Sequence, residues 1–212
     1  MDNVLLELVK ITPSVLWFAL IVILIIRFYH PFRQDILPKI KMFEAAGVKF
    51  TLVRDSIDAA IKLAEKSPQW KVDVSEKDKR SAEQRARANI SVFKGSFILW
   101  VDDHPENNLN ERKMFKALGA DIDVALNTED AIRVLENGEY DLVFSDMARG
   151  DDEQAGLDFL KQLREKKNTI PVIFYVGVID PDKCAPDCSF GITNRPDELL
   201  HYTLDVLERK KY

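Results

Sequence analysis

Residues 98 to 108 read ILWVDDHPENN, an apolar run that ends on two adjacent carboxylates, Asp102 and Asp103. Two like charges 4 Å apart repel each other by about 4 kcal/mol when the effective dielectric constant is near 20. A buried strand that ends on such a pair therefore needs something nearby that offsets the repulsion.

Short apolar runs alternate with amphipathic segments from Phe97 onward. We interpret five runs as strands: FILWV (97–101), DIDVAL (121–126), DLVFS (141–145), PVIFYV (171–176) and SFGIT (189–193). Helices are predicted at 106–118, 128–137, 155–167 and 196–210, with Gly119 and Gly138 as stops, Thr128 as a cap and Pro196 as a first residue. This alternation predicts an α/β domain with a doubly wound, five-stranded parallel sheet that is buried on both faces.

A third carboxylate, Asp146, follows the strand DLVFS directly. Ligands of open parallel sheets gather at the carboxyl ends of the strands, so Asp102, Asp103 and Asp146 are expected to converge on one edge. Oxygen ligands of this kind suit Mg²⁺, which favours octahedral oxygen coordination and keeps waters for an incoming phosphate. A bound Mg²⁺ would offset the repulsion between the carboxylates.

The order of these motifs resembles the receiver domain of two-component response regulators. The resemblance covers residues 97–210: a strand with Asp-Asp, a strand with Asp, then strands ending in IPVIFYVG and GITNRP. It implies a flavodoxin-like fold, with Asp146 as the phosphoacceptor and Asp102 and Asp103 as the residues that hold Mg²⁺. The backbone carbonyl of Ala148 would be a further metal ligand.

Three positions depart from the pattern of that family. The hydroxyl residue of its fourth strand corresponds to Val176, which has no hydrogen-bonding side chain. Its lysine before proline corresponds to Arg195, which keeps the charge and could contact phosphate with two nitrogens. Its aromatic switch residue corresponds to Ile192. The loop MARGDDEQAG, from the acceptor to Gly156, is also about two residues longer than usual.

Residues 11–30 are expected to form a transmembrane helix after a short tail at 1–10. The run from Ile11 to Tyr29 is 19 residues long and contains only Arg27 as a charge. As a helix it would be about 28 Å long, close to the roughly 30 Å of a bilayer's hydrocarbon core. The start MDNVLLELVK and the exit RFYHPFR do not fit a cleaved signal peptide.

Positive residues beside this span predict its orientation. Only Lys10 precedes it, whereas the residues that follow or end it include Arg27, Arg33, Lys39 and Lys41. Positive flanks stay in the cytoplasm, so we expect a single-pass protein of the inner or plasma membrane with a cytoplasmic C-terminal domain. Cys184 and Cys188 would then be reduced thiols. The net charge of −5 argues against a nucleic-acid partner.

Residues 31–94 are interpreted as a mostly helical juxtamembrane linker that precedes a receiver-like domain at 95–212. Val48, Phe50 and Leu52 alternate with polar residues, which suggests a strand within this region. Ser75 with Asp78 resembles a helix capping box, and the charged run after it is expected to be a solvated face.

Two functions are compatible with these residues. In the first, Asp146 accepts a phosphoryl group with Mg²⁺ from a histidine kinase or phosphotransfer protein and signals to a downstream protein. In the second, the domain is an interaction module without phosphotransfer. A membrane effector whose span responds to a signal sensed by the sheet domain also fits the layout. An enzyme is not expected, because a phosphatase of this type would want an Asp where Ala148 stands. His104 is interpreted as a rim residue.

Overall fold

The computed structural model describes residues 37–66, 72–179 and 185–210, together with residues 17, 18, 20, 21 and 27. The predicted tail and most of the predicted span at 11–30 lie outside these residues, as does Cys184. Among the residues described, no helix combines the length and the apolar character needed to cross a membrane.

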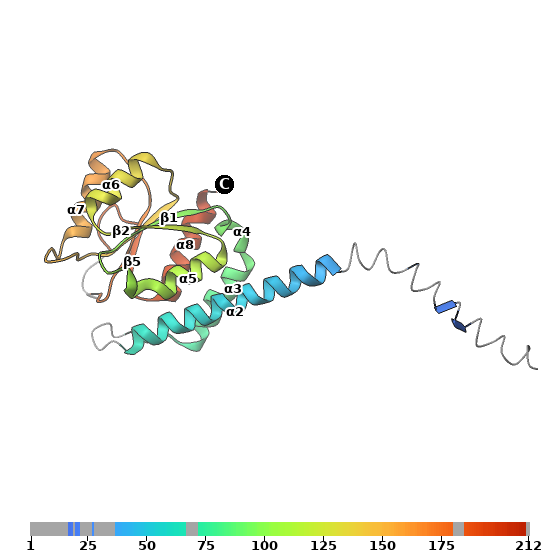
Figure 1. The fold of residues 1–212 in the computed structure, drawn as a ribbon. Helices are drawn as coiled ribbons and strands as arrows, with labels where there is room; N and C mark the ends of the chain where they lie inside the picture. The colour runs from blue at the N-terminus through green and yellow to red at the C-terminus, as the bar shows by residue number, and fades with distance from the viewer. Residues whose placement is uncertain are drawn as a thin grey trace, which may run out of the picture. The chain divides into compact units, whose positions relative to one another are not determined.

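A five-stranded parallel sheet forms the centre of the fold, in the order β2-β1-β3-β4-β5 (Figure 1). Its strands are β1 (Phe97–Val101), β2 (Asp121–Ala125), β3 (Leu142–Ser145), β4 (Val172–Tyr175) and β5 (Gly191–Thr193). Every neighbouring pair is parallel, and Val101 lies beside Ala125 on one side and Ser145 on the other. The predicted flavodoxin-like α/β sheet is confirmed.

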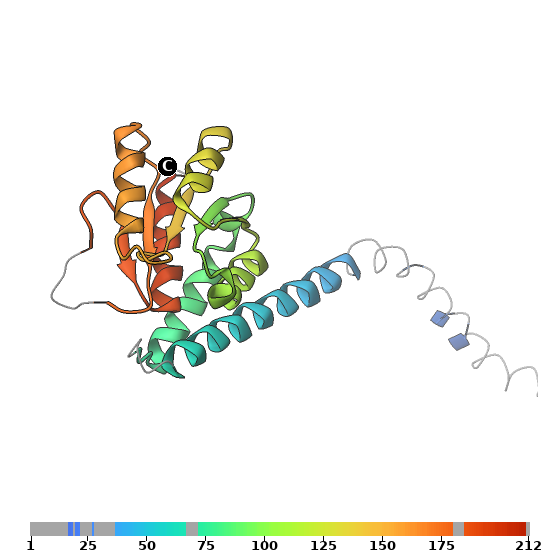
Figure 2. The ribbon, with the colours of Figure 1, turned by 60° about the vertical axis from the view of Figure 1, so that its left-hand side comes forward.

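Both faces of the sheet are buried, because side chains alternate between them along each strand. On one face Trp100, Phe144 and Tyr175 pack with apolar residues of the helices that cover it. On the other face Val101, Phe174 and their neighbours pack with a second group of helices. The ribbon shows helices on both sides of the sheet (Figure 2). This explains why the strands are apolar at consecutive positions.

The helices after β1 are α5 (Leu109–Leu118), α6 (Thr128–Asn137), α7 (Ala155–Glu165) and α8 (Pro196–Lys210), with the short 3₁₀ helix η2 (Pro105–Asn108) before α5. Gly119 ends α5 in the left-handed region, where glycine carries no steric penalty. The expected cap at Thr128 is wrong by one residue. The Asn127 side chain caps α6 by accepting from the Asp130 N–H, and its two-carbon side chain offers an amide oxygen for that role.

Between residue 37 and the sheet the structure describes the helices α2 (Leu37–Lys66), α3 (Glu76–Ala88) and α4 (Ile90–Phe93). The strand suggested by Val48, Phe50 and Leu52 is wrong, because α2 includes these residues. From Val53 to Ala64 the buried residues of α2 recur at helical spacing, and this longer stripe decides the local structure.

The compact unit that contains the sheet runs from Lys49 to Tyr212. Ile57 and Ile61 of α2, Ala82 of α3 and Phe93 of α4 are fully buried in the same core as Trp100 of β1. The hydrophobic core of the sheet therefore includes residues that precede the predicted domain boundary at residue 95 in the sequence.

Helix α3 packs along α8, so its charged sequence is not simply a solvated face. Ala82 and Ala86 are completely buried, and small side chains at these positions let the two helices approach closely. Arg85 donates to Asp205 at 2.5 Å and to Glu208 at 3.1 Å. Its second terminal nitrogen is 3.3 Å from the backbone oxygen of His201. The charges of α3 thus serve a helix–helix contact.

We expect Ile57→Ala to lower the free energy of unfolding of the full chain by about 2–5 kcal/mol, because it leaves a cavity in the core shared by α2 and the sheet. Urea unfolding followed by tryptophan fluorescence, to which buried Trp100 contributes, measures this loss. Leu63→Ala, on the same helix but 48% exposed, is the control and should change stability by no more than about 0.5 kcal/mol. A loss of stability for Ile57→Ala as small as that expected for Leu63→Ala would show that α2 does not share the core.

Candidate functional site: an acidic cluster at the sheet edge

Asp102, Asp103 and Asp146 meet at the carboxyl edge of the sheet, as the sequence predicts. Asp102 and Asp103 follow β1 directly, and Asp146 follows β3, its parallel neighbour. One side-chain oxygen from each residue lies within 4.8 Å of the other two. Three carboxylates from two adjacent strands therefore surround one small volume.

Asp102 is the most buried of the three, at 8% exposure. Its Oδ1 accepts from the backbone N–H of His104 at 2.7 Å, and its Oδ2 accepts from the Asn108 side chain at 2.7 Å. Burial raises the pKa of Asp102, and the charge of Asp103 raises it further. Two donors thus orient this carboxylate in a position where its charge is costly.

Asn108 is a site residue that the sequence analysis missed. It lies at the end of η2, is 2% exposed, and its own Oδ1 has no protein hydrogen-bond partner. The loop sequence HPENN offers two asparagines, and only the turn geometry shows that the second one reaches Asp102.

Asp103 connects the end of β1 to the loop that follows β3. Its Oδ2 accepts from the backbone N–H of Gly150 at 2.8 Å. Gly150 has a φ of 57°, a conformation that glycine adopts without strain. Exposed His104 lies 3.7 Å from Asp103 and 3.4 Å from Glu106, which places it at the rim of the cluster.

Asp146 carries the clearest electrostatic sign of crowding. Burial raises its pKa to about 6, and the charges of Asp102 and Asp103 add to this effect. A hydrogen bond from the Met147 N–H to Oδ1, at 2.7 Å, opposes the shift. Burial is thus the main reason why the charged form of Asp146 is costly, and the neighbouring carboxylates increase this cost.

The donor set fits a hard divalent cation. Three carboxylates provide oxygen ligands only, and oxygen is the donor atom that Mg²⁺ prefers. A divalent cation bound between them would reverse the repulsion that raises the pKa of Asp146. The proposed fourth ligand, the carbonyl of Ala148, lies in the same loop, and its role stays a prediction.

Arg149 is a second residue that the sequence analysis missed. It is 8% exposed although it belongs to a charged loop. Its guanidinium donates to the backbone oxygen of Asp146 at 3.0 Å and to that of Ala155 at 2.7 Å. It also donates to the hydroxyls of Ser145 and Thr128, at 3.0 and 2.8 Å. Arg149 therefore fixes the loop that carries Asp146 through neutral oxygens, and Thr128 serves this contact instead of capping α6.

Gly156 allows α7 to begin directly against this loop. Its N–H donates to the Met147 oxygen at 2.8 Å. A Cβ at this position would lie 2.5 Å from the Asp146 oxygen and 2.9 Å from the Met147 Cα. Only glycine allows such a close approach of the two backbones.

Val176 lies just beyond β4 and lines a small cavity of about 50 Å³ together with Asp102 and Asp146. It is 6% exposed, and its N–H donates to the Thr193 oxygen at 3.0 Å. A hydrophobic side chain therefore faces the position where a hydroxyl would contact a phosphoryl group. Ile192, on β5, is partly buried in the apolar core on the α6–α7 face of the sheet.

Tyr175, next to Val176, also lines this cavity and connects it to a buried carboxyl group. Its hydroxyl donates to Oε1 of Glu111 on α5 at 2.8 Å, and Glu111 is only 1% exposed. Burial raises the pKa of Glu111. The sequence pattern placed Glu111 on an amphipathic helix and gave no sign of this pair.

Arg195 does not reach the acidic cluster in this structure. Its guanidinium pairs with Asp197 at 2.7 Å, Asp78 at 3.2 Å and Glu198 at 3.4 Å. Contact with a phosphate would require Arg195 to exchange one of these carboxylates. Its predicted role as a phosphate contact stays a prediction.

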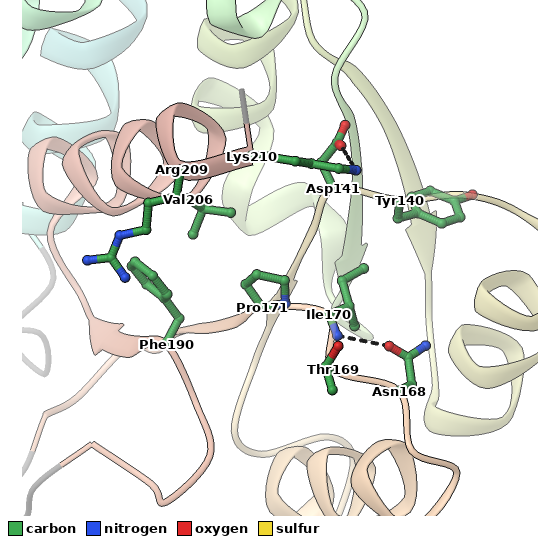
Figure 3. A pocket seen from close by; sticks show the side chains of 10 residues that line it. All are labelled: Tyr140, Asp141, Asn168, Thr169, Ile170, Pro171, Phe190, Val206, Arg209 and Lys210. Carbon is green, nitrogen blue, oxygen red and sulfur yellow. Dashed lines mark hydrogen bonds and ion pairs between the residues drawn. The ribbon is translucent and has the colours of Figure 1, made fainter. Parts of the chain in front are cut away.

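A larger cavity of about 550 Å³ lies at the amino ends of β3, β4 and β5, away from the acidic cluster (Figure 3). Phe190 and Pro171 form part of its wall, and the Arg209 guanidinium lies over the Phe190 ring, 5.3 Å from its centroid. Its one carboxylate, Asp141, is already paired with Lys210. Among the residues that the structure describes, the acidic cluster is the one group of three or more metal-ligating side chains.

Residues 98–190 match the family model of the response regulator receiver domain. This part of the chain is therefore a receiver domain, a signalling module of two-component systems rather than an enzyme. The match covers β1 to β4 and the three acidic residues.

Known proteins with similar sequence or structure include a sensor protein and response regulators. The sensor protein EvgS of Escherichia coli strain K12 is 28% identical over 92 residues, which are 43% of this chain and 8% of EvgS. This chain thus matches only a small part of the length of that relative. The response regulator TrrA from Thermotoga maritima, crystallised with Mg²⁺ and BeF, is 24% identical, with 52% of this chain and 98% of TrrA covered and a TM-score of 0.46. A response regulator from Clostridium difficile is 23% identical, with 55% and 99% covered and a TM-score of 0.47.

We expect Asn108→Ala to weaken Mg²⁺ binding by roughly 10-fold, because the residue that orients a metal ligand is lost. Isothermal titration calorimetry of the full chain with MgCl₂, at constant ionic strength, measures the affinity. Asn110→Ala is the matched control, since Asn110 lies nearby on α5 but does not line the cavity beside Asp102 and Asp146, and it should bind Mg²⁺ as the wild type does. Identical affinities of all three proteins would contradict the assigned role of Asn108.

Proposed function

Because residues 98–190 form a response regulator receiver domain, we propose that the chain accepts a phosphoryl group on Asp146 in an Mg²⁺-dependent reaction. The observation that carries this proposal is the convergence of Asp102, Asp103 and Asp146 within 4.8 Å at the sheet edge. A carboxylate nucleophile next to a metal site is the arrangement that phosphoryl transfer to protein requires.

In the proposed reaction an oxygen of Asp146 attacks the phosphorus of a donor, and the bond from phosphorus to the donor atom breaks. Bound Mg²⁺ would screen the charge between the two anions. The Met147 N–H holds Oδ1 of Asp146, which orients the carboxylate before the attack. Arg149 fixes the backbone of the same loop, so the nucleophile does not need to be ordered during the reaction.

Receiver domains receive their phosphoryl groups from histidine kinases. We propose a histidine kinase or a phosphotransfer protein as the donor for this chain and a further protein as the partner that receives the signal. The match of residues 98–190 to the receiver domain supports this choice of donor.

An interaction module without phosphotransfer is the second candidate. Val176 supplies no hydroxyl at the cavity, and Ile192 supplies no aromatic ring at the position where the family has its switch. Arg195 is engaged by three carboxylates. These observations favour a domain that binds Mg²⁺ or a partner protein through the same edge.

We expect the full chain, incubated with Mg²⁺ and acetyl phosphate, to gain one phosphoryl group per molecule, detected by intact-protein mass spectrometry at neutral pH. Asp146→Asn should gain none, because an amide is not a nucleophile toward phosphorus. Asp151→Asn removes an exposed carboxylate from the same loop and should be phosphorylated as the wild type is. An unmodified but folded wild type would favour the interaction module.

We also propose that residues 11–30 span the inner or plasma membrane once, with the receiver domain on the cytoplasmic side. Four residues of this segment whose side chains the structure describes, Trp17, Phe18, Leu20 and Ile21, are apolar and exposed. Contact with lipid tails is favourable for apolar side chains, whereas their exposure to water is unfavourable. The excess of Lys and Arg after the segment supports the orientation.

Extraction of membranes with alkaline carbonate tests this proposal. The full chain should stay in the membrane pellet, and a variant that lacks residues 11–30 should move to the supernatant. Release of both forms would rule out a spanning helix.

A further inference from the structure

Arg195 connects the start of α8 to a helix that lies far away in sequence. It is located between β5 and α8, and its side chain is 25% exposed. Two of its nitrogens contact Asp197, with Nη2 to Oδ2 at 2.7 Å and Nε to Oδ1 at 3.3 Å. Nη2 also donates to Oδ2 of Asp78 on α3 at 3.2 Å. One guanidinium therefore bridges the two helices.

The two aspartates differ in how easily they could lose this cation. Asp197 is 2% exposed and binds Arg195 with both carboxylate oxygens. Loss of Arg195 would leave a buried carboxylate without a cation, which is costly. Asp78 is 45% exposed and makes a single, longer contact. Water and the Ser75 hydroxyl, which donates to Asp78 at 2.9 Å, would still solvate Asp78 after separation. Of the two aspartates, Asp78 is thus the one that exchanges at the lower cost, while Glu198, 39% exposed and 3.4 Å away, belongs to α8 as Asp197 does.

The contact with Asp78 fastens the beginning of α3. Ser75 caps this helix by accepting from the Asp78 N–H, and the first helical bond runs from the Lys79 N–H to the Ser75 oxygen at 3.1 Å. Further along, Arg85 holds α3 to α8 through Asp205 and Glu208. The first turn of α3 is therefore fastened by Arg195 together with Val74, which is buried in the core just before the helix, while the later part of α3 is attached through Arg85.

Arg195 also lies at the edge of the sheet that carries the acidic cluster. It follows the carboxyl end of β5, and its N–H donates to the Thr193 hydroxyl at 3.0 Å. Thr193 accepts, through its backbone oxygen, from Val176, which lines the cavity beside Asp146. Two hydrogen bonds, one to the Thr193 hydroxyl and one to the Thr193 backbone oxygen, thus link the backbone of Arg195 to the wall of the acidic site.

We propose that Arg195 transmits the phosphorylation state of Asp146 to helix α3 by exchanging Asp78 for the phosphoryl group. This inference rests on the proposed function, since it requires phosphorylation of Asp146. In the unphosphorylated chain Arg195 bridges Asp78 and Asp197. A phosphoryl group carries about two negative charges and presents several acceptor oxygens, so it competes with the single contact of Asp78. The first turn of α3 then loses its attachment to α8.

The consequence is a route for output through the N-terminal helices. Helix α3 precedes the sheet and follows α2, which leads toward the N-terminal part of the chain. A change at the start of α3 would act on α2, because Ile57 and Ile61 of α2 lie in the same core as Ala82 of α3. Val176 enters this connection only through its backbone N–H, so no side-chain hydroxyl is required at position 176.

Hydrogen–deuterium exchange of the full chain in detergent micelles tests the proposal, with Mg²⁺ and acetyl phosphate present or absent. We expect the amides at the start of α3, from Lys79 onward, to exchange about 5-fold faster in the phosphorylated chain, a typical size for coupling between two sites. Asp146→Asn should show no response to the donor. Intact-protein mass spectrometry of the same samples records how much phosphoryl group is present.

Asp78→Asn removes the contact directly. It should speed exchange at the start of α3 without any donor and reduce the additional change that phosphorylation causes. Because coupling is reciprocal, it should also tighten the binding of beryllofluoride with Mg²⁺ by about 5-fold. Glu76→Gln is the matched control, since Glu76 lies in the same turn and pairs only with Lys79 of α3, at 3.1 Å. It should leave both measurements unchanged.

A phosphorylated chain whose α3 exchange stays constant would overturn this inference and leave the proposed function intact. A wild type that takes up neither phosphoryl group nor beryllofluoride would overturn both. The comparison of wild type with and without donor decides the matter even when Asp78→Asn fails to fold.

Discussion

The repulsion among three carboxylates is the constraint on which the rest of the site depends. Parallel pairing of β1 with β3 brings Asp102, Asp103 and Asp146 to within 4.8 Å, where each pair of charges repels by about 3.5 kcal/mol at an effective dielectric near 20. Backbone N–H groups of His104, Met147 and Gly150 are directed at these carboxylates and reduce the cost in part. Burial, together with the charges of Asp102 and Asp103, still raises the pKa of Asp146.

Two arginines next to this cluster are used in different ways. Arg149 is buried beside Asp146, yet it donates to hydroxyls and carbonyls and so acts as a brace for the loop. Arg195 is partly exposed and is bound only through carboxylates, which an anion can replace. The loop that holds the proposed nucleophile is therefore tied in place, whereas Arg195, the charge proposed to respond to phosphorylation, follows β5, two strands away from β3.

The sequence predicts the sheet well, because apolar runs and the turn residues between them are local signals. The acidic cluster is also predictable, since the carboxyl ends of adjacent parallel strands must share an edge. Asn108, Arg149 and the Tyr175–Glu111 pair could not be found this way, because each depends on a partner that only the folded chain brings near. The alternation from Val48 to Leu52 misled for the opposite reason: five residues show a period of two by chance within a helix of 30 residues.

The burial of Ile57, Ala82 and Phe93 in one core with Trp100 affects how this protein can be divided for study. A fragment that starts where the family match starts would leave the inner side of α8 without its cover, and the freed apolar surface would favour self-association. Soluble material for crystallisation or spectroscopy should therefore begin no later than Lys49, so that the purified domain keeps its own hydrophobic lining.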